Sequence, residues 1–326
     1  SPDSPHLYDL SVTLKSGDKV VDSVGSYFGM RKIALGKDEK GITRPMLNGK
    51  FVFQVGPLDQ GFWPDGIYTA PTDEALRWDI ETMKKLGFNC VRKHLKVEPS
   101  RWYYWCDKLG LMVWQDMPSA NSYLDGKDRE KPVAVDKPQY KTELINMVRS
   151  NWNHPSIIMW VVFNEEQGQH DTDSLAAEVK GLDPTRLLNP ASGTTVWGKV
   201  HDTKSGDVMD VHIYPGPSSP TPTAERVAVL GEFGGLGFPV EGHKWSKNVW
   251  GYKNSADPKT WISEYEKLLA KTWELKDQPG LSGAIYTQLT DVESEGNGLV
   301  TYDREVIKMD IDRVKAANTG KPPVQP

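Results

Sequence analysis

The pattern of hydrophobic and polar positions changes once along the chain, near residue 44. Before that point, the alternating runs LYDLSVTL and VVDSVGSYFGMRKI, separated by the polar turn SGDK, predict short strands. Two or three strands alone would be marginally stable, so this segment is typical of the tail of a β-sandwich. From about residue 44, short apolar runs alternate with helical patterns, which is the signature of parallel β/α units. We therefore expect a β-rich segment over residues 1–36 and a larger α/β domain over residues 37–326.

The second part of the chain contains eight short apolar runs that predict strands. The run IIMWVVF at 157–163 has the continuous apolar character of a strand that is buried on both faces. Eight strands separated by helices favour a closed (β/α)8 barrel, and an open doubly wound sheet is disfavoured because no Gly-x-Gly-x-x-Gly turn follows a strand. The strands are expected over 51–56, 89–94, 111–116, 157–163, 186–192, 208–214, 226–233 and 281–289. The helices are expected over 73–86, 99–110, 137–152, 171–182, 258–277 and 303–317.

Composition narrows the range of partners. The chain has 326 residues, and its 38% hydrophobic and 25% charged residues are typical of a soluble globular protein without a membrane-spanning run. A net charge of −5 gives no basic face for nucleic acid. Cys90 and Cys106 are expected to be buried free thiols, with no disulfide and no metal-type Cys/His spacing. Because the chain starts at Ser1 without Met or a signal peptide, we expect a fragment of a longer protein, and its compartment stays undetermined, with a periplasmic or extracellular parent compatible with the sequence.

Twelve tryptophans are a high count for this length. Flat indole faces suit the apolar faces of sugar rings, and burial in the core or in an interface is the ordinary alternative. Five of these residues lie at predicted strand ends or in loops, namely Trp63, Trp114, Trp197, Trp245 and Trp250.

The polar residues at the predicted strand ends are candidates for chemistry, because the reactive groups of a barrel lie where strands end and loops begin. Glu165 ends the fourth strand and Glu232 ends the seventh, on opposite sides of the barrel mouth. Glycosidic bond cleavage needs two such carboxyl groups. The alternative, that each glutamate only pairs with a lysine or arginine, is disfavoured for two glutamates on apolar strands. The other strand-end candidates are Arg92, His94, Gln115, Asp116, Asn164, Glu166, His212, Tyr214, Gln288 and Asp291.

Several stretches resemble glycoside hydrolase family 2. HPSIIMWVVFNEEQG (154–168) and VLGEFGGLG (229–237) resemble the two catalytic strands of that family. MLNGKFVFQVGPLDQGFWPDG (46–66), LGFNCVRKHLKVEP (86–99) and YYWCDKLGLMVWQDMP (103–118) resemble its first three strands, and SYFGMRKI (26–33) resembles the last strand of the immunoglobulin-like domain before its barrel. The resemblance implies a clan A barrel and a carbohydrate substrate. It also implies that a sugar-binding jelly-roll domain and most of the immunoglobulin-like domain lie outside this chain.

The resemblance also implies roles for individual residues. Glu165 corresponds to the general acid/base, which needs a raised pKa, and Glu232 to the nucleophile, which must be ionised. A separation of about 5–5.5 Å between them would give retention of the anomeric configuration. Asn164 is expected to hydrogen-bond the sugar 2-hydroxyl, Arg92 to lie close to the nucleophile, and Tyr214 to hydrogen-bond it. The adjacent Glu166 is the weaker candidate. Further sugar contacts are expected from His94, Asp116, Trp197, His212 and Gln288.

The sequence departs from the family pattern at three places. The loop QDMPSANSYLDG after the third strand lacks the Glu and His of the magnesium site found in some β-galactosidases, so no metal and no other cofactor is expected. No Asn-x-Lys signature of the β-glucuronidases stands in DVESEGNGLVTYDR after the eighth strand, which counts against a uronic acid substrate. Tyr286 stands where many relatives have Trp.

The sequence therefore predicts a retaining, exo-acting β-glycosidase, with a β-galactoside as the default substrate and a β-mannoside or β-glucoside next. The alternative is a carbohydrate-binding pseudoenzyme or an inactive catalytic fragment of a larger glycosidase. An unrelated barrel enzyme such as an aldolase or isomerase is disfavoured. Lys93 is the one lysine at a predicted strand end, and no glycine-rich phosphate loop is evident apart from GGLG (234–237).

Overall fold

A computed structural model describes residues 1–119, 135–193 and 202–321 of the chain. Eight parallel strands form one sheet in the order β10-β9-β8-β7-β6-β15-β12-β11. The two edge strands meet, because the Asp207 backbone N–H donates to the Leu188 carbonyl (2.8 Å) and the Asn189 side chain donates to Asp210 (2.7 Å). The predicted (β/α)8 barrel is thereby confirmed. Its strands are β6 (Gln54–Asp59), β7 (Cys90–Lys93), β8 (Met112–Asp116), β9 (Ile157–Val161), β10 (Leu187–Asn189), β11 (Val208–Ile213), β12 (Val227–Gly234) and β15 (Leu281–Thr287).

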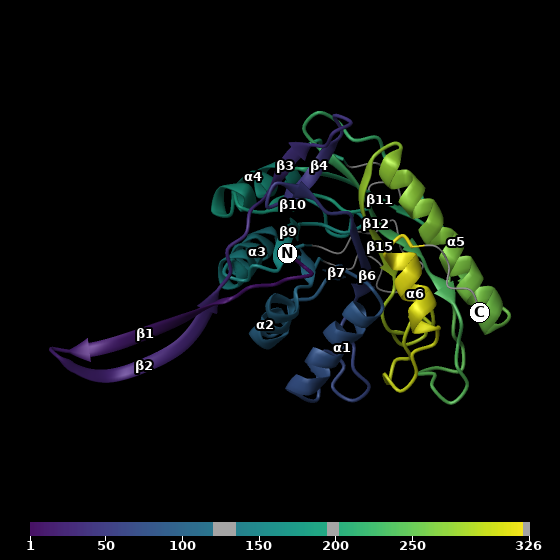
Figure 1. The fold of residues 1–326 in the computed structure, drawn as a ribbon, viewed down its shortest axis with the longest axis horizontal. Helices are drawn as coiled ribbons and strands as arrows, with labels where there is room; N and C mark the ends of the chain where they lie inside the picture. Colours follow the sequence, from purple (N-terminus) through teal and green to yellow (C-terminus); the bar gives the residue numbers. More distant parts are fainter. Residues whose placement is uncertain (120–134, 194–201, 322–326) are drawn as a thin grey trace.

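Six helices surround this sheet in the described part of the chain (Figure 1). The Thr72 hydroxyl caps the first of them by accepting from the backbone N–H of Ala75 (3.1 Å), which satisfies a donor that a helix start leaves unpaired. The helices are α1 (Asp73–Lys85), α2 (Ser100–Leu109), α3 (Lys137–Asn151), α4 (Thr172–Leu182), α5 (Pro258–Asp277) and α6 (Ile311–Asn318). None of the described helices combines the length and the apolar character that a membrane span needs.

One expectation about the helices is corrected. The last helix begins at Ile311 and not at residue 303, because the Asp303 carboxylate accepts from Thr301 and from the backbone N–H of Glu305 in a local turn. The helix then starts where Asp310 accepts from the backbone N–H of Arg313. In addition, residues 214–226 join β11 to β12 without a helix, since four prolines in this stretch remove backbone donors.

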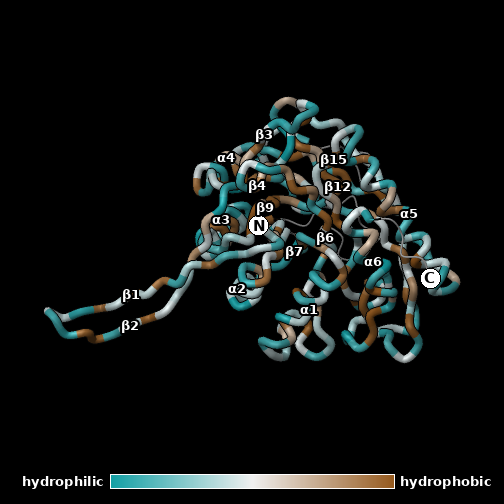
Figure 2. The backbone as a smooth tube through the Cα atoms, in the orientation of Figure 1, coloured by the Kyte–Doolittle hydropathy of each residue, from teal (hydrophilic) through white to brown (hydrophobic). Residues whose placement is uncertain are grey.

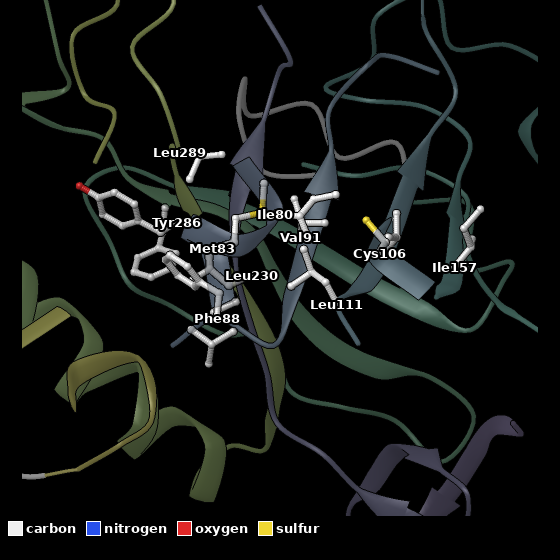
Figure 3. Close-up of a cluster of buried hydrophobic side chains, with 14 of the residues drawn as sticks. Ile80, Met83, Phe88, Val91, Cys106, Leu111, Ile157, Leu230, Tyr286 and Leu289 are labelled. Atoms are coloured by element: carbon white, nitrogen blue, oxygen red, sulfur yellow. The ribbon is translucent and has the colours of Figure 1, made fainter. Parts of the chain in front are cut away.

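Successive side chains along each strand point alternately into the barrel and toward the helices, and this produces two apolar layers. In β7 and β8 the outward residues Val91 and Val113 pack under the helices, and the inward residue Trp114 fills the barrel. The indole N–H of Trp114 donates to Gln54 (2.6 Å) inside the barrel. Figure 3 shows part of the outer layer, where Ile80 and Met83 of α1 lie against strand residues. Cys90 and Cys106 are buried free thiols, as predicted.

The N-terminal part consists of antiparallel strands. β1 (Tyr8–Ser16) and β2 (Lys19–Phe28) form a hairpin that projects from the body of the molecule (Figure 1) and carries hydrophobic stretches along both strands (Figure 2). β3 (Ile33–Lys37), β4 (Thr43–Leu47) and β5 (Lys50–Phe51) form a small sheet whose Ile33 and Leu47 join the inner apolar layer. As a consequence, the first barrel strand begins three residues later than predicted. A short parallel pair, β13 (Leu236–Gly237) and β14 (Lys253–Asn254), follows β12.

Candidate active site

Glu165 and Glu232 lie together at the carboxyl end of the barrel, as the sequence predicts. Glu165 follows β9, and Glu232 is in the last part of β12. One carboxylate oxygen of each, together with a ring nitrogen of His212, lies within 4.8 Å of the others. Both carboxylates are largely buried, since the exposed fraction of the side chain is 16% for Glu165 and 7% for Glu232. The two strands therefore bring a pair of acidic groups into direct proximity.

The backbone around the two glutamates is unusual. Glu165 and Glu166 have positive φ angles of 47° and 62°, a left-handed conformation that non-glycine residues seldom adopt outside functional sites. The Ser192 carbonyl holds this turn by accepting from the backbone N–H of Glu165 (2.9 Å). On the opposite side, the pairing of β11 with β12 shifts at Gly231, directly before Glu232. A β-carbon at Gly231 would collide with the Asp210 carboxylate, so this bulge depends on glycine.

Arg92 is the buried centre of the polar network. Its guanidinium makes two hydrogen bonds to Asp116 (3.0 and 2.8 Å). It also donates to Oε1 of Glu232 (3.1 Å) and to Oδ1 of Asn164 (2.8 Å). Because Oδ1 of Asn164 is an acceptor here, its Nδ2 is the atom that remains as a donor for a ligand hydroxyl. One guanidinium thus fixes the orientation of Glu232 and Asn164 together.

Two tyrosines flank the other oxygen of Glu232. The Tyr214 hydroxyl donates to Oε2 of Glu232 (2.6 Å) and lies 2.7 Å from the Thr287 hydroxyl. The Tyr252 ring stacks on that of Tyr214, with ring centroids 3.6 Å apart and an interplanar angle of 3°. The two oxygens of Glu232 therefore have different neighbours, since Arg92 holds Oε1 and Tyr214 holds Oε2.

His212 links Glu165 to the barrel interior. Its Nδ1 lies 2.8 Å from Oε1 of Glu165, and its Nε2 lies 2.8 Å from the Ser192 hydroxyl. That hydroxyl donates to Asp210 (2.6 Å), which leaves its oxygen as an acceptor for Nε2. Both ring nitrogens of His212 can therefore donate, which suits an imidazolium. Nη1 of Arg92 also lies 3.2 Å from Nε2, and because a guanidinium only donates, Nε2 accepts from it when the ring is neutral.

The electrostatics of the two carboxyl groups differ from the expectation. Burial raises the pKa of Glu165, but the hydrogen bond from His212 and the charges of His212 and Arg92 bring it below the ordinary value. Burial raises the pKa of Glu232, and the Glu165 carboxylate adds to this, against the influence of His212, Arg92 and Tyr214. Burial lowers the pKa of His212, but the Glu232, Asp210 and Glu165 carboxylates raise it overall. The pKa directions of Glu165 and Glu232 are therefore the reverse of those expected for a protonated acid/base and an ionised nucleophile.

His94 is the remaining polar group beside Glu232. Its Nε2 lies 3.6 Å from Oε1 of Glu232 and has no hydrogen-bond partner among the described residues. Burial, Arg92 and His212 hold the pKa of His94 well below its ordinary value, so the ring is neutral. The Nε2 atom is itself buried, so the sugar contact expected of His94 stays a prediction.

The loop after β15 adds a second polar chain to the site. Gln288 donates to Oδ1 of Asn297 (2.9 Å) and accepts from Nε2 of Gln60 (2.9 Å). Asn297 in turn donates to the Glu295 carboxylate (2.8 Å). Burial and the nearby Glu232 carboxylate raise the pKa of Glu295 to about 7, although Asn297, Gln288 and Gln60 oppose this.

The expected sugar contacts of Asp116 and Gln288 are corrected. The Asp116 side chain is 1% exposed, and both of its oxygens are hydrogen-bonded to Arg92, so Asp116 positions Arg92. Both amide atoms of Gln288 are used by Asn297 and Gln60, so Gln288 positions the loop that carries Glu295. Trp197 lies outside the described residues.

The tryptophans at strand ends are partly reassigned. Trp114 is fully buried inside the barrel and cannot stack on a sugar. Trp63 is also buried, with the Arg304 guanidinium 3.9 Å from the centre of its ring. Trp245 and Trp250 are exposed by 49% and 44%, and they stay candidates for stacking.

Sequence reasoning missed Tyr252 and Glu295. Neither follows a strand directly, and both lie in long loops at the carboxyl end of the barrel. The signal that could have found Glu295 is its place in the loop after the eighth strand, because such loops build barrel active sites. Tyr252 had no signal in its sequence neighbourhood, since its position depends on stacking against Tyr214.

Within the described ranges, one group of acidic residues and histidines has the spacing of a metal site, and it is the set Glu165, His212 and Glu232. Within this set His212 is hydrogen-bonded to Glu165, and Glu232 is hydrogen-bonded to Tyr214 and Arg92. The buried guanidinium places a positive charge directly beside the position that a cation would take. The set is therefore better suited to acid–base and nucleophilic chemistry than to holding a metal ion.

Models of known protein families match two parts of the chain. The model described as "Glycosyl hydrolases family 2, TIM barrel domain" matches residues 69–228, and the model "Glycosyl hydrolases family 2" matches residues 1–31. Among curated relatives, a putative β-glucuronidase from Formosa agariphila is 31% identical, and a β-galactosidase from Lactococcus lactis subsp. lactis is 33% identical. Each match covers 59% of this chain but only 18% and 19% of the relatives. Each match thus spans less than a fifth of the length of its relative.

Solved structures support the fold over nearly the whole chain. A β-galacturonidase from Eisenbergiella tayi bound to galacturonate has a TM-score of 0.74 at 19% identity, covering 99% of this chain and 60% of that one. A β-glucuronidase from Parabacteroides merdae also has a TM-score of 0.74 at 19% identity, covering 97% and 42%. At this identity the likeness establishes the fold alone.

Proposed function

Because the chain belongs to glycoside hydrolase family 2, to which the two matching family models assign more than half of its residues, we propose that its barrel carries the site of an exo-acting β-glycosidase that retains the anomeric configuration. The observation that carries the proposal is the pair Glu165 and Glu232, whose carboxylate oxygens approach within 4.8 Å. Carboxyl groups of retaining enzymes are about 5–5.5 Å apart, whereas inverting enzymes need about 6.5–9.5 Å to admit water.

In the proposed first step, Glu232 attacks the anomeric carbon and the bond to the leaving oxygen breaks as that oxygen takes a proton from Glu165. In the second step, Glu165 removes a proton from water, which attacks the anomeric carbon and releases Glu232. Arg92 and Tyr214 hold the two oxygens of Glu232 in place for the attack. Asn164, fixed by Arg92, offers its Nδ2 to the sugar 2-hydroxyl.

The reversed pKa order is explained if His212 stores the catalytic proton. Its Nδ1 lies 2.8 Å from Glu165, so the proton can move to the carboxylate when negative charge develops on the leaving oxygen. A substrate that excludes water from Glu165 favours this transfer, because desolvation disfavours the charged carboxylate. We propose that His212 and Glu165 act together as the general acid.

If His212 stores the proton, the loss of kcat/KM on replacing it should depend on the leaving group of the substrate. His212→Asn should lower kcat/KM for an alkyl β-glycoside by about 100-fold, because general acid catalysis contributes about that much or more. The same variant should change kcat/KM much less for a dinitrophenyl β-glycoside, whose leaving group needs no proton. Steady-state kinetics with both substrates checks this, and an equal loss on both would contradict the storage role.

The substrate is proposed to be a β-galactoside, with a β-mannoside or β-glucoside next. The curated relatives include proteins named for β-galactosides and, putatively, for β-glucuronides, so they do not choose between neutral sugars and uronic acids.

Activity is tested with a panel of aryl β-glycosides. The unmodified chain should hydrolyse at least one of them, and Glu165→Gln and Glu232→Gln should each abolish most of that turnover. Glu166→Gln, which changes the adjacent carboxylate, is the matched control and should retain activity. Absence of turnover that depends on both glutamates would overturn the proposal. Sugar binding without hydrolysis would support the alternative of a carbohydrate-binding protein.

A further inference from the structure

Glu295 is held beside the catalytic pair by the loop after β15. The loop is fixed to the segment before β14, because the Trp250 backbone N–H donates to the Ser294 carbonyl (2.9 Å) and its carbonyl accepts from Gly296 (2.8 Å). These two bonds bracket Glu295 on both sides. The side chain is fixed as well, since its carboxylate accepts from Nδ2 of Asn297 (2.8 Å). Glu295 is therefore a rigidly placed acidic group.

Among the described residues, Glu295 forms no ion pair with a lysine, arginine or histidine, and its side chain is hydrogen-bonded to a neutral amide. Its carboxylate interacts with the neutral amides of Asn297, Gln288 and Gln60, and the Glu232 carboxylate is the charged group that acts on it most strongly. Lys308 contacts this loop, since its Nζ lies 3.4 Å from the Gly296 carbonyl, but its charge is paired with Asp291 (2.6 Å). Arg92 is already committed to Asp116.

The position of Glu295 relative to a bound sugar follows from the neighbours of Glu232. Arg92 and Asn164 lie on the Oε1 side of that carboxylate, which is the side proposed for the sugar 2-hydroxyl. In a pyranose ring, carbon 2 and the ring oxygen are on opposite sides of the anomeric carbon. The ring oxygen and the substituent on carbon 5 are therefore directed toward the Oε2 side, where Tyr214 lies.

Tyr252 connects this side of the site to Glu295. Its ring stacks on Tyr214, and burial together with the Glu232, Glu295 and Glu165 carboxylates raises the pKa of its hydroxyl. The centre of the Tyr252 ring also lies 5.4 Å from that of Trp250, whose backbone is hydrogen-bonded to the residues on both sides of Glu295. A substituent on carbon 5 that extends past Tyr214 and Tyr252 would approach Glu295.

We propose that Glu295 is a specificity-determining residue that makes this site accept neutral glycosides and exclude uronides, an inference that rests on the proposed glycosidase function. A hydroxymethyl group on carbon 5 can donate a hydrogen bond to the Glu295 carboxylate. A carboxylate at the same position meets a like charge, while the cations Arg92 and Lys308 are already paired with Asp116 and Asp291, so the position carries a repulsive element of the kind that creates specificity. The facing titratable groups, Glu232 and Tyr252, offer no positive charge either.

The test compares an aryl β-galactoside with the matching β-galacturonide at about pH 8, where Glu295 is ionised because its pKa is about 7. The unmodified chain should have a kcat/KM at least about tenfold higher for the neutral substrate, and Glu295→Gln should reduce this ratio about tenfold or more. Glu293→Gln, which removes an exposed carboxylate from the same loop, is the control and should leave the ratio unchanged.

A preference of the unmodified chain for the uronide, or an unchanged ratio in Glu295→Gln, would overturn the inference. Calorimetric binding of free galactose and galacturonate to the same three proteins gives a readout that does not need turnover. If no glycoside is hydrolysed, the proposed function fails, and the binding ratio still decides the role of Glu295. Equal affinity for the two sugars in the unmodified chain, or no binding of either, would contradict it.

Discussion

Among single residues, Asp116 illustrates how burial decides a role. Asp116 and Arg92 form an ion pair in which neither side chain is more than 1% exposed. Asp73 and Arg101 form a pair with the same two-bond geometry (2.9 and 2.7 Å) at the surface. Removing one partner of a buried pair leaves an uncompensated charge, whereas an exposed pair is screened by water.

This contrast predicts different effects on stability. Asp116→Asn should lower the free energy of unfolding by about 3 kcal/mol or more, and Asp73→Asn should lower it by about 1 kcal/mol or less. Urea denaturation of both variants measures this. Equal effects, or a stable Asp116→Asn variant that loses only sugar affinity, would restore the binding role that the sequence suggested.

Glu295 predicts a pH dependence of stability. Its folded pKa of about 7 lies above the ordinary value of about 4.3, so folding favours the protonated form. The stability that this form contributes is fully present below about pH 4 and is lost as the pH rises through 7.

The unmodified chain should therefore lose stability relative to Glu295→Gln between pH 5 and 8, by on the order of 2 kcal/mol for a partly exposed group. Urea denaturation at both pH values gives this difference. A difference that stays constant with pH would show that the Glu295 carboxyl has an ordinary pKa.

The sequence located some site residues and misjudged others for a physical reason. Glu165, Glu232 and Tyr214 stand at the ends of apolar strands, so the barrel alone brings them to one place. The roles of Asp116 and Gln288 depend on which neighbours use their hydrogen-bonding atoms, and spacing along the chain does not carry that information. Tyr252 and Glu295 lie in long loops, whose path depends on contacts with distant segments.

Among the elements, the strands and most helices follow from local pattern, and the exceptions involve side chains that act on the backbone. Asp303 and its turn delay the last helix, and the prolines between β11 and β12 prevent one. The first barrel strand was displaced because the antiparallel strands continue to Phe51. An apolar run such as FVFQVG does not reveal which of its residues join the barrel.

The β1–β2 hairpin makes a prediction at this scale. Val12 and Val24 face each other across the hairpin and are both more than half exposed, so Val12→Thr/Val24→Thr should change the free energy of unfolding by about 0.5 kcal/mol or less. Arg31, just after the hairpin, donates to the carbonyls of Pro155, Thr185 and Ile157. Arg31→Ala should cost about 2 kcal/mol, because it removes three hydrogen bonds to backbone carbonyls, of which the Ile157 carbonyl keeps a second donor, Arg186.

Urea denaturation monitored by tryptophan fluorescence compares the two variants. If Val12→Thr/Val24→Thr lowers the free energy of unfolding as much as Arg31→Ala does, the hairpin strands themselves stabilise the barrel.

For the whole molecule, the fold and the chemistry were predictable to different degrees. The barrel and its family follow from the order of strands and from two motifs, because both are fixed by short stretches of sequence. The choice of sugar could not be predicted in this way, because the residues proposed to face carbon 5 come from separate loops. The directions of the pKa shifts at the site were also beyond the sequence, since they depend on His212, Glu165 and Glu232 together.

The central claim is that Glu232 is the nucleophile of a retaining mechanism, and trapping the covalent intermediate tests it most directly. The chain would be incubated with activated 2-deoxy-2-fluoro β-glycosides of galactose, glucose and mannose, and then digested and examined by mass spectrometry. We predict one glycosyl unit attached to the peptide that contains Glu232, and no label in Glu232→Gln. A label on Glu165 or on another residue, or turnover that inverts the anomeric centre, would contradict the account.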